Sequence, residues 1–358
     1  MNSMKRTTLY PEHVRLGAKI VEFAGWEMPI QYTSVVAECK SVRERAGMFD
    51  VSHMGRLTFR GDRVLEFLEW ITANDVSKLT NGGSQYSLLC YENGTCVDDI
   101  IVYRINENLF RMVVNAANHD KDLEWIKSHN TYGVAIEDET MQTAMIAVQG
   151  PKACEITQSL SKDNVLAIER FHSSECNVAG ANSFIARTGY TGEDGFELVV
   201  PSQESVKVWQ ALLEKNVVPC GLAARDVLRV EAGLPLYGHE LSDQISPIEA
   251  GLGWVVSKTK KFIGSDAIER MRKEGTRRKL VGILMDGRMV PREGYPVFCN
   301  GKEIGKMSSG VYSPTLERGI GFAFVSSEYA EEGLRCEVLI RDKGFPATVV
   351  SKRFLKKK

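Results

Sequence analysis

Apolar residues in the first part of the chain follow two different spacings. Apolar positions three to four residues apart predict a helix over about 34–46, which Gly47 is placed to end. Residues 48–60 then alternate between apolar and polar positions, as a strand does, and the helical spacing returns over 63–71. The pattern therefore predicts a helix, a strand and a helix, in this order.

Residues 85–115 change to an alternating pattern that turn residues interrupt. Segments 85–91 and 95–104 flank a turn at 92–94, and segment 109–115 follows a second turn. Connections this short join antiparallel strands, so the pattern predicts a three-strand meander. Further helices are predicted over about 118–128, 151–160, 203–214 and 222–232, and further strands over 134–136, 144–148 and 183–186.

The pattern changes again after Lys279. From there the chain consists of short apolar segments divided by turn signals such as Asn300-Gly301, which predicts an antiparallel barrel or sandwich. The charge-rich stretch 258–278 is the expected joint, that is, the segment that connects the two parts of the chain. Because the meander is antiparallel, an α+β class fits better than a doubly wound parallel sheet. We therefore expect an α+β region before residue 279 and a β-domain over 279–358.

Composition narrows the class of protein. Of 358 residues, 43% are hydrophobic and 25% charged, and the formal net charge is −1, which indicates a globular protein of two or three domains without a nucleic-acid footprint. The eight cysteines and six histidines show no metal-ligand spacing. No secretory signal and no apolar run of about 18 residues is present. We expect a soluble, cytoplasmic protein with reduced cysteines and no metal, nucleic-acid or membrane partner.

Two adjacent aspartates, Asp98 and Asp99, interrupt the apolar run CVDDIIVY. Neighbouring side chains of a strand point to opposite faces, so at least one carboxylate is directed toward packed or ligand-lined space. A carboxylate in such a place has partners or a raised pKa, and a raised pKa suits a proton acceptor that works near neutral pH. The alternative is an aspartate near a hairpin turn that binds only backbone.

A glycine-rich segment, RTGYTGEDGFEL, leads from Arg187 into a further strand. Glycines at this density allow the backbone to approach a ligand closely. In the strand, Phe196 and Leu198 face one side and Glu197 the other. Glu197 is either a solvent-facing residue on an edge strand or a carboxylate that accepts paired N–H donors from a flat heterocycle.

The segment GLAARDVLRVEAGLPLYGHEL carries Arg225 and Arg229 one helical turn apart. The two arginines either form salt bridges on a surface helix, or Arg225 holds an anionic or carbonyl-bearing part of a ligand. In DVSHMG, Met54 could pack against an aromatic ligand from a strand end, and His53 is expected to be a structural hydrogen-bonder. A tryptophan packs in the core more often than it forms a platform for a cofactor, so Trp254 is expected in the core.

Taken together, these segments resemble the glycine cleavage T-protein family of folate-binding aminomethyltransferases. The resemblance runs in register from Thr8 to about Lys352. Its motifs are FAGWEMPIQY, MFDVSHMG, VDDIIVY, VVNAAN, QGPKA, RTGYTGEDGFE, GLAARDVLRVEAGLPLYG and SPIEAGLGWVV.

The resemblance implies a three-part, cloverleaf-like architecture around a central folate channel. Residues 1–270 would form a folate-binding region of two intertwined α+β subdomains, and residues 279–358 a C-terminal antiparallel β-barrel. The implied reaction belongs to glycine catabolism. An aminomethyl group is taken from the lipoyl arm of the H protein, and its methylene carbon passes to tetrahydrofolate. The products are 5,10-methylenetetrahydrofolate, ammonia and the dihydrolipoyl H protein.

The resemblance also implies roles for single residues. Asp99 would be catalytic near N10 of the folate, Glu197 would bind the pterin edge, and Arg225 would be a second folate contact. Further positions match those that line the family's folate pocket. They are Met54, Tyr86, Tyr103, Asn115, Tyr190, Tyr237 and Trp254.

Two other functions stay open. A folate-dependent demethylase of the same superfamily would share the pocket and differ at the donor side. A non-catalytic folate-binding protein of the iron–sulfur maintenance type would carry a cysteine where this chain has Arg187-Thr188-Gly189-Tyr190. Many relatives have a tyrosine near the C-terminus, where this chain has Phe354. The basic tail 352–358 is expected to be solvated or attracted to an acidic partner.

Overall fold

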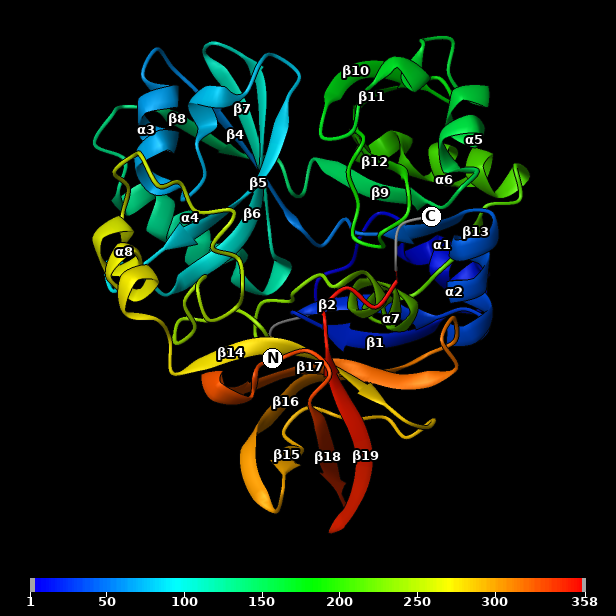
Figure 1. Cartoon of the computed structure of the whole chain (residues 1–358). Coiled ribbons are helices and arrows are strands. Elements are labelled where there is room, and N and C mark those ends of the chain that lie inside the picture. The colour runs from blue at the N-terminus through cyan, green and yellow to red at the C-terminus, as the bar shows by residue number, and fades with distance from the viewer. Residues whose placement is uncertain (1–3, 356–358) are drawn as a thin grey trace. The chain divides into compact units, whose positions relative to one another are not determined.

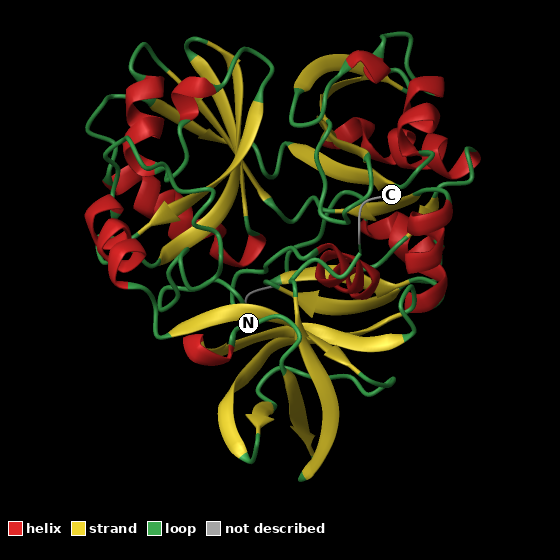
Figure 2. Cartoon of the chain, in the orientation of Figure 1, coloured by secondary structure: helices red, strands yellow, loops and turns green. Residues whose placement is uncertain are grey.

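The computed structural model describes residues 4–355 (Figures 1 and 2). These residues divide into two units that interleave along the chain. Unit 1 comprises residues 4–87, 100–189 and 193–225. Unit 2 comprises residues 88–99, 190–192 and 226 onward. The division at residues 270–279 that the sequence suggested stays a prediction.

The first sheet of unit 1 has six strands in the order β10-β11-β12-β9-β3-β13. Their bounds are β3 Gly47–Asp50, β9 Thr143–Gln149, β10 Ser173–Val178, β11 Ala181–Ala186, β12 Gly195–Pro201 and β13 Val218–Pro219. The helices of this part are α1 Tyr10–Arg15, α2 Val35–Glu44, α5 Ala153–Ser159 and α6 Ser205–Glu214. Trp209 of α6 is fully buried in the same apolar cluster as Val148 and Phe196 of the sheet. This cluster forms a core of unit 1 beside its first sheet.

The second sheet has five strands in the order β5-β6-β7-β4-β8. Their bounds are β4 Gly55–Arg60, β5 Ser84–Cys90, β6 Cys96–Asn106, β7 Leu109–Val114 and β8 Ala135–Asp138, with helices α3 Val64–Ile71 and α4 His119–Ser128. Phe67 of α3 packs against Phe59 of β4, with ring centroids 6.3 Å apart. A separate antiparallel hairpin consists of β1 Lys19–Phe23 and β2 Trp26–Gln31.

Unit 2 contains a closed antiparallel barrel in the order β14-β17-β16-β15-β18-β19 (Figure 1). Its strands are β14 Arg278–Met285, β15 Pro296–Cys299, β16 Lys302–Ser313, β17 Arg318–Ser326, β18 Arg335–Ile340 and β19 Lys343–Val350. Inward residues such as Ile283, Val297 and Val338 form its apolar core. Helix α7, Leu222–Ala232, runs from unit 1 into unit 2, and α8, Ser265–Glu274, precedes the barrel.

Short 3-10 turns complete the described elements at Val76–Lys78, Ala116–Asn118, Val165–Ala167, Ser202–Glu204 and Ser327–Tyr329. Within residues 4–355, no helix has the length and apolar character needed to cross a membrane.

Most of the predicted elements are confirmed, including the α+β class, the meander and the C-terminal barrel. Helix α2 begins where expected, because the Ser34 side chain accepts a hydrogen bond from the Ala37 N–H at 3.2 Å. Gly47 does not end this helix but begins β3. The stretch 258–278 was expected to be a joint, and it contains α8.

The single strand predicted over 48–60 is wrong. It is two strands, β3 and β4, which belong to different sheets. The Asp50 carboxylate accepts the Ser52 N–H at 2.9 Å, and the Met54 N–H donates to the Val51 carbonyl at 3.0 Å. These local bonds form a turn that ends the strand, although the apolar and polar residues keep alternating through it.

Candidate functional site

Glu197 occupies the middle of the first sheet. It pairs with Ala147 of β9 on one side and with Ala186 of β11 on the other, so β12 is not an edge strand. Only 8% of its surface is exposed. The Thr188 hydroxyl donates a hydrogen bond to Glu197 Oε2 at 2.6 Å. The solvent-facing alternative is therefore wrong, and the carboxylate retains acceptor positions for a ligand.

Tyr103 of β6 lies beside Glu197 within unit 1. Burial raises the pKa of the Tyr103 phenol above its ordinary value, and the negative charge of Glu197 raises it further. The ring packs edge-on against Phe184 of β11, with centroids 5.3 Å apart. The structure thus brings together a buried carboxylate and a neutral phenol from different sheets.

Met54 lies in the turn between β3 and β4, which several hydrogen bonds hold. The Arg56 guanidinium donates to the Ser52 carbonyl at 3.0 Å and to the Met54 carbonyl at 2.5 Å. Asp50 Oδ2 lies 2.8 Å from His13 Nε2 and accepts the Thr7 hydroxyl at 2.6 Å. Met54 is half-buried, so its side chain is presented on a fixed backbone.

His53, in the same turn, is close enough to Arg225 for their charges to interact. Burial lowers the pKa of His53 to about 4, and the positive charges of Arg225 and Arg56 act in the same direction against the opposing charge of Asp50. Within residues 4–355, the buried Nδ1 has no hydrogen-bond partner. The hydrogen-bonding role expected of His53 is therefore not seen at this nitrogen, and the ring is neutral at physiological pH.

The two aspartates of β6 have different surroundings. Asp98 is 0% exposed and shares its strand face with the buried residues Cys96, Ile100 and Val102. Asp99, on the opposite face, is half-buried. Of the pair, Asp98 is fully buried and Asp99 is partly exposed.

Tyr190 and Tyr237 lie in unit 2, as does Asp99. The Tyr237 hydroxyl donates to the Cys96 carbonyl at 3.2 Å, three residues before Asp99 on β6. The Tyr190 hydroxyl donates to the Pro235 carbonyl. The segment 235–237 therefore connects both tyrosines to the beginning of β6.

The remaining residues predicted for the site are more dispersed. Tyr86 is half-buried on β5, and Asn115 is half-buried directly after β7. Trp254 is 75% exposed, so its expected place in the core is wrong.

Sequence reasoning missed Thr188 as the hydrogen-bond partner of Glu197. The only sequence signal for Thr188 was a hydroxyl within the glycine-rich segment. No cluster of three or more His, Cys, Asp or Glu side chains that could hold a metal occurs among the described residues.

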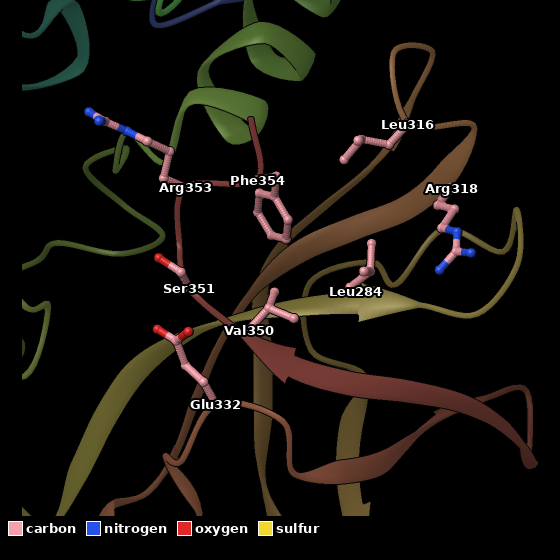
Figure 3. Close-up of a pocket in the computed structure, with 8 residues that line it drawn as sticks. All are labelled: Leu284, Leu316, Arg318, Glu332, Val350, Ser351, Arg353 and Phe354. Carbon is pink, nitrogen blue, oxygen red and sulfur yellow. The ribbon is translucent and has the colours of Figure 1, made fainter. Parts of the chain in front are cut away.

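A groove of about 360 Å³ lies on the barrel of unit 2, and the chain's C-terminal segment forms part of its wall (Figure 3). None of the predicted site residues lines it. Phe354 packs against Phe322 of β17, with ring centroids 5.9 Å apart, and its N–H donates to the Glu231 carbonyl at 3.2 Å. The prediction of a solvated tail is therefore wrong for Lys352, Phe354 and Leu355, which are half-buried, whereas Arg353 is exposed. Residues 356–358 lie outside the described part.

Comparison with known families decides the identity of the chain. Residues 9–260 match the model of the GCVT N-terminal domain, and residues 278–356 match that of the glycine cleavage T-protein C-terminal barrel domain. The chain belongs to the glycine cleavage T-protein family. This family uses folate.

Individual members of the T-protein family match over almost their full length. The chain is 48% identical to the aminomethyltransferase of Symbiobacterium thermophilum, over 98% of this chain and 97% of that protein. It is 43% identical to the aminomethyltransferase of Bacillus subtilis, over 99% of this chain and 100% of that protein.

A solved T-protein structure has the same fold. The crystal structure of glycine cleavage system aminomethyltransferase T from Bartonella henselae matches with a TM-score of 0.93 at 32% identity, over 99% of this chain and 98% of that chain. The T-protein architecture that the motifs implied is therefore confirmed.

Proposed function

We propose that this chain is the aminomethyltransferase of a glycine cleavage system. It takes the aminomethyl group from the lipoyl arm of the H protein and transfers the methylene carbon to tetrahydrofolate. The products are 5,10-methylenetetrahydrofolate, ammonia and the dihydrolipoyl H protein. The observation that carries the proposal is the match to aminomethyltransferases over nearly the whole of each chain.

Asp99 is the proposed catalytic residue. Partial exposure of Asp99 supports this choice over Asp98, which is fully buried. A carboxylate that accepts the N10 N–H of tetrahydrofolate both orients this nitrogen and increases its nucleophilicity toward the methylene carbon.

Glu197 and Arg225 are the proposed folate contacts of unit 1. The pterin ring presents neighbouring N–H donors in one plane, and a carboxylate accepts such a pair with strong directional preference. Burial of Glu197 strengthens this contact because water competes poorly there. The half-buried Arg225 supplies a positive charge for an anionic or carbonyl-bearing part of the ligand.

The other residues of the proposed pocket line the ligand without a defined chemical role. They are Met54, Tyr86, Tyr103, Asn115, Tyr190, Tyr237 and Trp254. We further propose a cytoplasmic location, a lipoylated H protein as the macromolecular partner, and an α+β region over 1–270 followed by a barrel domain over 279–358.

The test is a reconstituted reaction with purified chain, tetrahydrofolate and aminomethylated H protein. We expect release of ammonia and formation of 5,10-methylenetetrahydrofolate. Asp99→Asn should lower turnover by about 10²–10⁴-fold, the usual contribution of a positioned proton acceptor, with folate affinity retained. Asp342→Asn in the exposed β18–β19 turn is the control and should behave as the wild type.

The same assay separates the alternatives. One-carbon transfer from a small methylated amine, without H protein, would favour a demethylase. Folate binding without turnover of any donor would favour a non-catalytic protein. Unchanged turnover in Asp99→Asn would remove the catalytic role from this residue.

A further inference from the structure

A buried ion pair holds the loop that follows α7. Arg229 is 2% exposed, and its guanidinium donates to Glu240 Oε2 at 2.8 Å. The same oxygen accepts the Leu236 N–H at 3.0 Å, while Glu240 Oε1 accepts the Ser308 hydroxyl at 2.6 Å. The carboxylate therefore links the ion pair to the loop backbone and to β16.

Arg229 makes further contacts from the other nitrogens of its guanidinium. It donates to Asp226 Oδ1 at 2.8 Å and to the Ser309 hydroxyl at 2.8 Å. Burial acts to lower the pKa of Arg229, but the negative charges of Glu240 and Asp226 raise it above its ordinary value. A charged arginine with this many fixed partners holds α7, the loop and β16 together.

The loop itself is tightly folded. The Leu234 N–H donates to the Arg229 carbonyl at 2.9 Å, and the Gly238 N–H donates to the Leu241 carbonyl at 2.7 Å. The N–H groups of His239 and Glu240 both donate to the Leu236 carbonyl, at 3.1 and 3.0 Å. Tyr237 thus projects from a backbone that has little freedom to move.

This loop and the segment after it hold the beginning of β6 at one residue. The Tyr237 hydroxyl donates to the Cys96 carbonyl at 3.2 Å. The Cys96 N–H donates to the carbonyls of Ser242 and Ile245, at 3.2 and 3.1 Å. In a strand the N–H and C=O of one residue point to the same edge, so segment 237–245 occupies that edge of β6 at Cys96.

The opposite edge is also fixed. The Thr95 carbonyl, which points the other way, accepts the Tyr91 N–H at 2.9 Å across the hairpin turn. Residues 95 and 96 are therefore held from both sides, and Asp99 follows three residues later on the same strand.

We propose that Tyr237 is a positioning residue for the reaction: its hydroxyl, on a loop braced by the Arg229–Glu240 pair, fixes the segment of β6 that carries Asp99. The proposal rests on the proposed function for the role of Asp99. In this proposal the Tyr237 hydroxyl is a hydrogen-bond donor to the backbone of β6 and does not contact the folate. Displacement of a reacting group by a fraction of an ångström lowers the rate of a step that depends on orientation.

The first experiment is Tyr237→Phe, which removes the hydroxyl and keeps the ring. We expect kcat for ammonia release to fall about tenfold, the scale of one lost hydrogen bond that orients a catalytic group. The Kd for tetrahydrofolate should change less than about twofold, because Glu197 and Arg225 are unaffected. Tyr329→Phe, which removes a hydroxyl from the surface of the same unit, is the matched control and should not change kcat.

The second experiment asks whether Tyr237 acts through Asp99. On an Asp99→Asn background, Tyr237→Phe should cause no further loss of turnover, because residues that act as one unit are not additive. A full additional tenfold loss on this background would overturn the proposal. So would a weakening of tetrahydrofolate binding equal to the loss in kcat, because it would mean that the hydroxyl contacts the ligand.

A third measurement does not depend on the reaction. Hydrogen exchange of the Cys96 amide should become faster in Tyr237→Phe, and also in Glu240→Gln if that variant folds, than in the wild type. Unchanged exchange in Tyr237→Phe would overturn the positioning role. If the wild type failed to transfer an aminomethyl group while Cys96 exchange still increased in the variant, the proposed function would fail and the hold on β6 would stand.

Discussion

Adjacent residues of one strand can have opposite surroundings, and Asp98 and Asp99 are an example. The alternation of side chains along a strand predicted that the two carboxylates would point to opposite faces. It did not predict which of them is buried, because burial depends on what packs against each face. The structure answers this point: Asp98 is fully buried and Asp99 is half-buried.

Glu197 is buried, and this burial leads to a prediction about folate binding. Glu197→Gln keeps the size of the side chain and replaces one acceptor oxygen by a donor. The mispaired amide should weaken tetrahydrofolate binding by about 1–3 kcal/mol, the cost of an unsatisfied polar group in a buried site. Isothermal titration with tetrahydrofolate measures this loss directly.

The matched control is Glu337→Gln on barrel strand β18, where the side chain is exposed. It should leave the affinity for tetrahydrofolate at the wild-type value. Equal affinity for tetrahydrofolate in Glu197→Gln and the wild type would remove Glu197 from the folate site.

At the scale of elements, the turn between β3 and β4 shows where a periodic pattern stops being informative. Asp50 ends β3 by hydrogen-bonding the backbone of its own turn and by contacting His13 and Thr7, which are far away in sequence. A strand pattern carries no signal for such distant partners. By contrast, the meander and the main helices were predictable, because their periodicity and turn residues agree with the tertiary structure.

The same turn predicts a pH dependence of stability. The pKa of His53 is about 4 in the folded chain, against an ordinary value of 6.5. Between these values the unfolded chain binds a proton that the folded chain does not, so this contribution to stability is present above pH 6.5 and is lost as the pH falls toward 4. From pH 7 to 4.5 the loss is about 2 kcal/mol.

His53→Gln removes the titrating ring. The free energy of unfolding of the variant should therefore fall about 2 kcal/mol less than that of the wild type over this pH interval, as measured by urea titration at each pH. Parallel pH profiles for the two proteins would show that the His53 ring is protonated as readily in the folded chain as in the unfolded one.

At the scale of the whole molecule, the two units are interleaved along the chain. Residues 88–99 and 190–192 belong to unit 2, although the chain before and after each of these segments belongs to unit 1. Short-range patterns predicted the strands and the barrel but could not predict this interleaving, because it depends on pairs such as Tyr237 and Cys96 that are 141 residues apart. The family motifs pointed to the site residues without giving these contacts.

Residues 354 and 355 give a prediction at this scale, since Phe354 contacts both α7 and the barrel. Phe354→Ala should destabilise the protein by about 1–2 kcal/mol, because it removes a half-buried aromatic ring from Phe322. Phe354→Tyr keeps the ring and should change stability little. Thermal unfolding of the two variants beside the wild type measures the difference, and equal losses in both would mean that ring packing is not the cause.

The long separation between Cys96 and Tyr237 has a consequence for biosynthesis. A ribosome makes the β5–β6 hairpin well before the residues that hold its tip. At usual elongation rates, the intervening 141 residues take on the order of 10 seconds to emerge. During this interval the nascent hairpin carries an unpaired strand edge beside Asp99, the proposed catalytic residue, and such edges pair readily with other strands. The hold on this part of β6 can therefore form only after residues 237–245 have been synthesised.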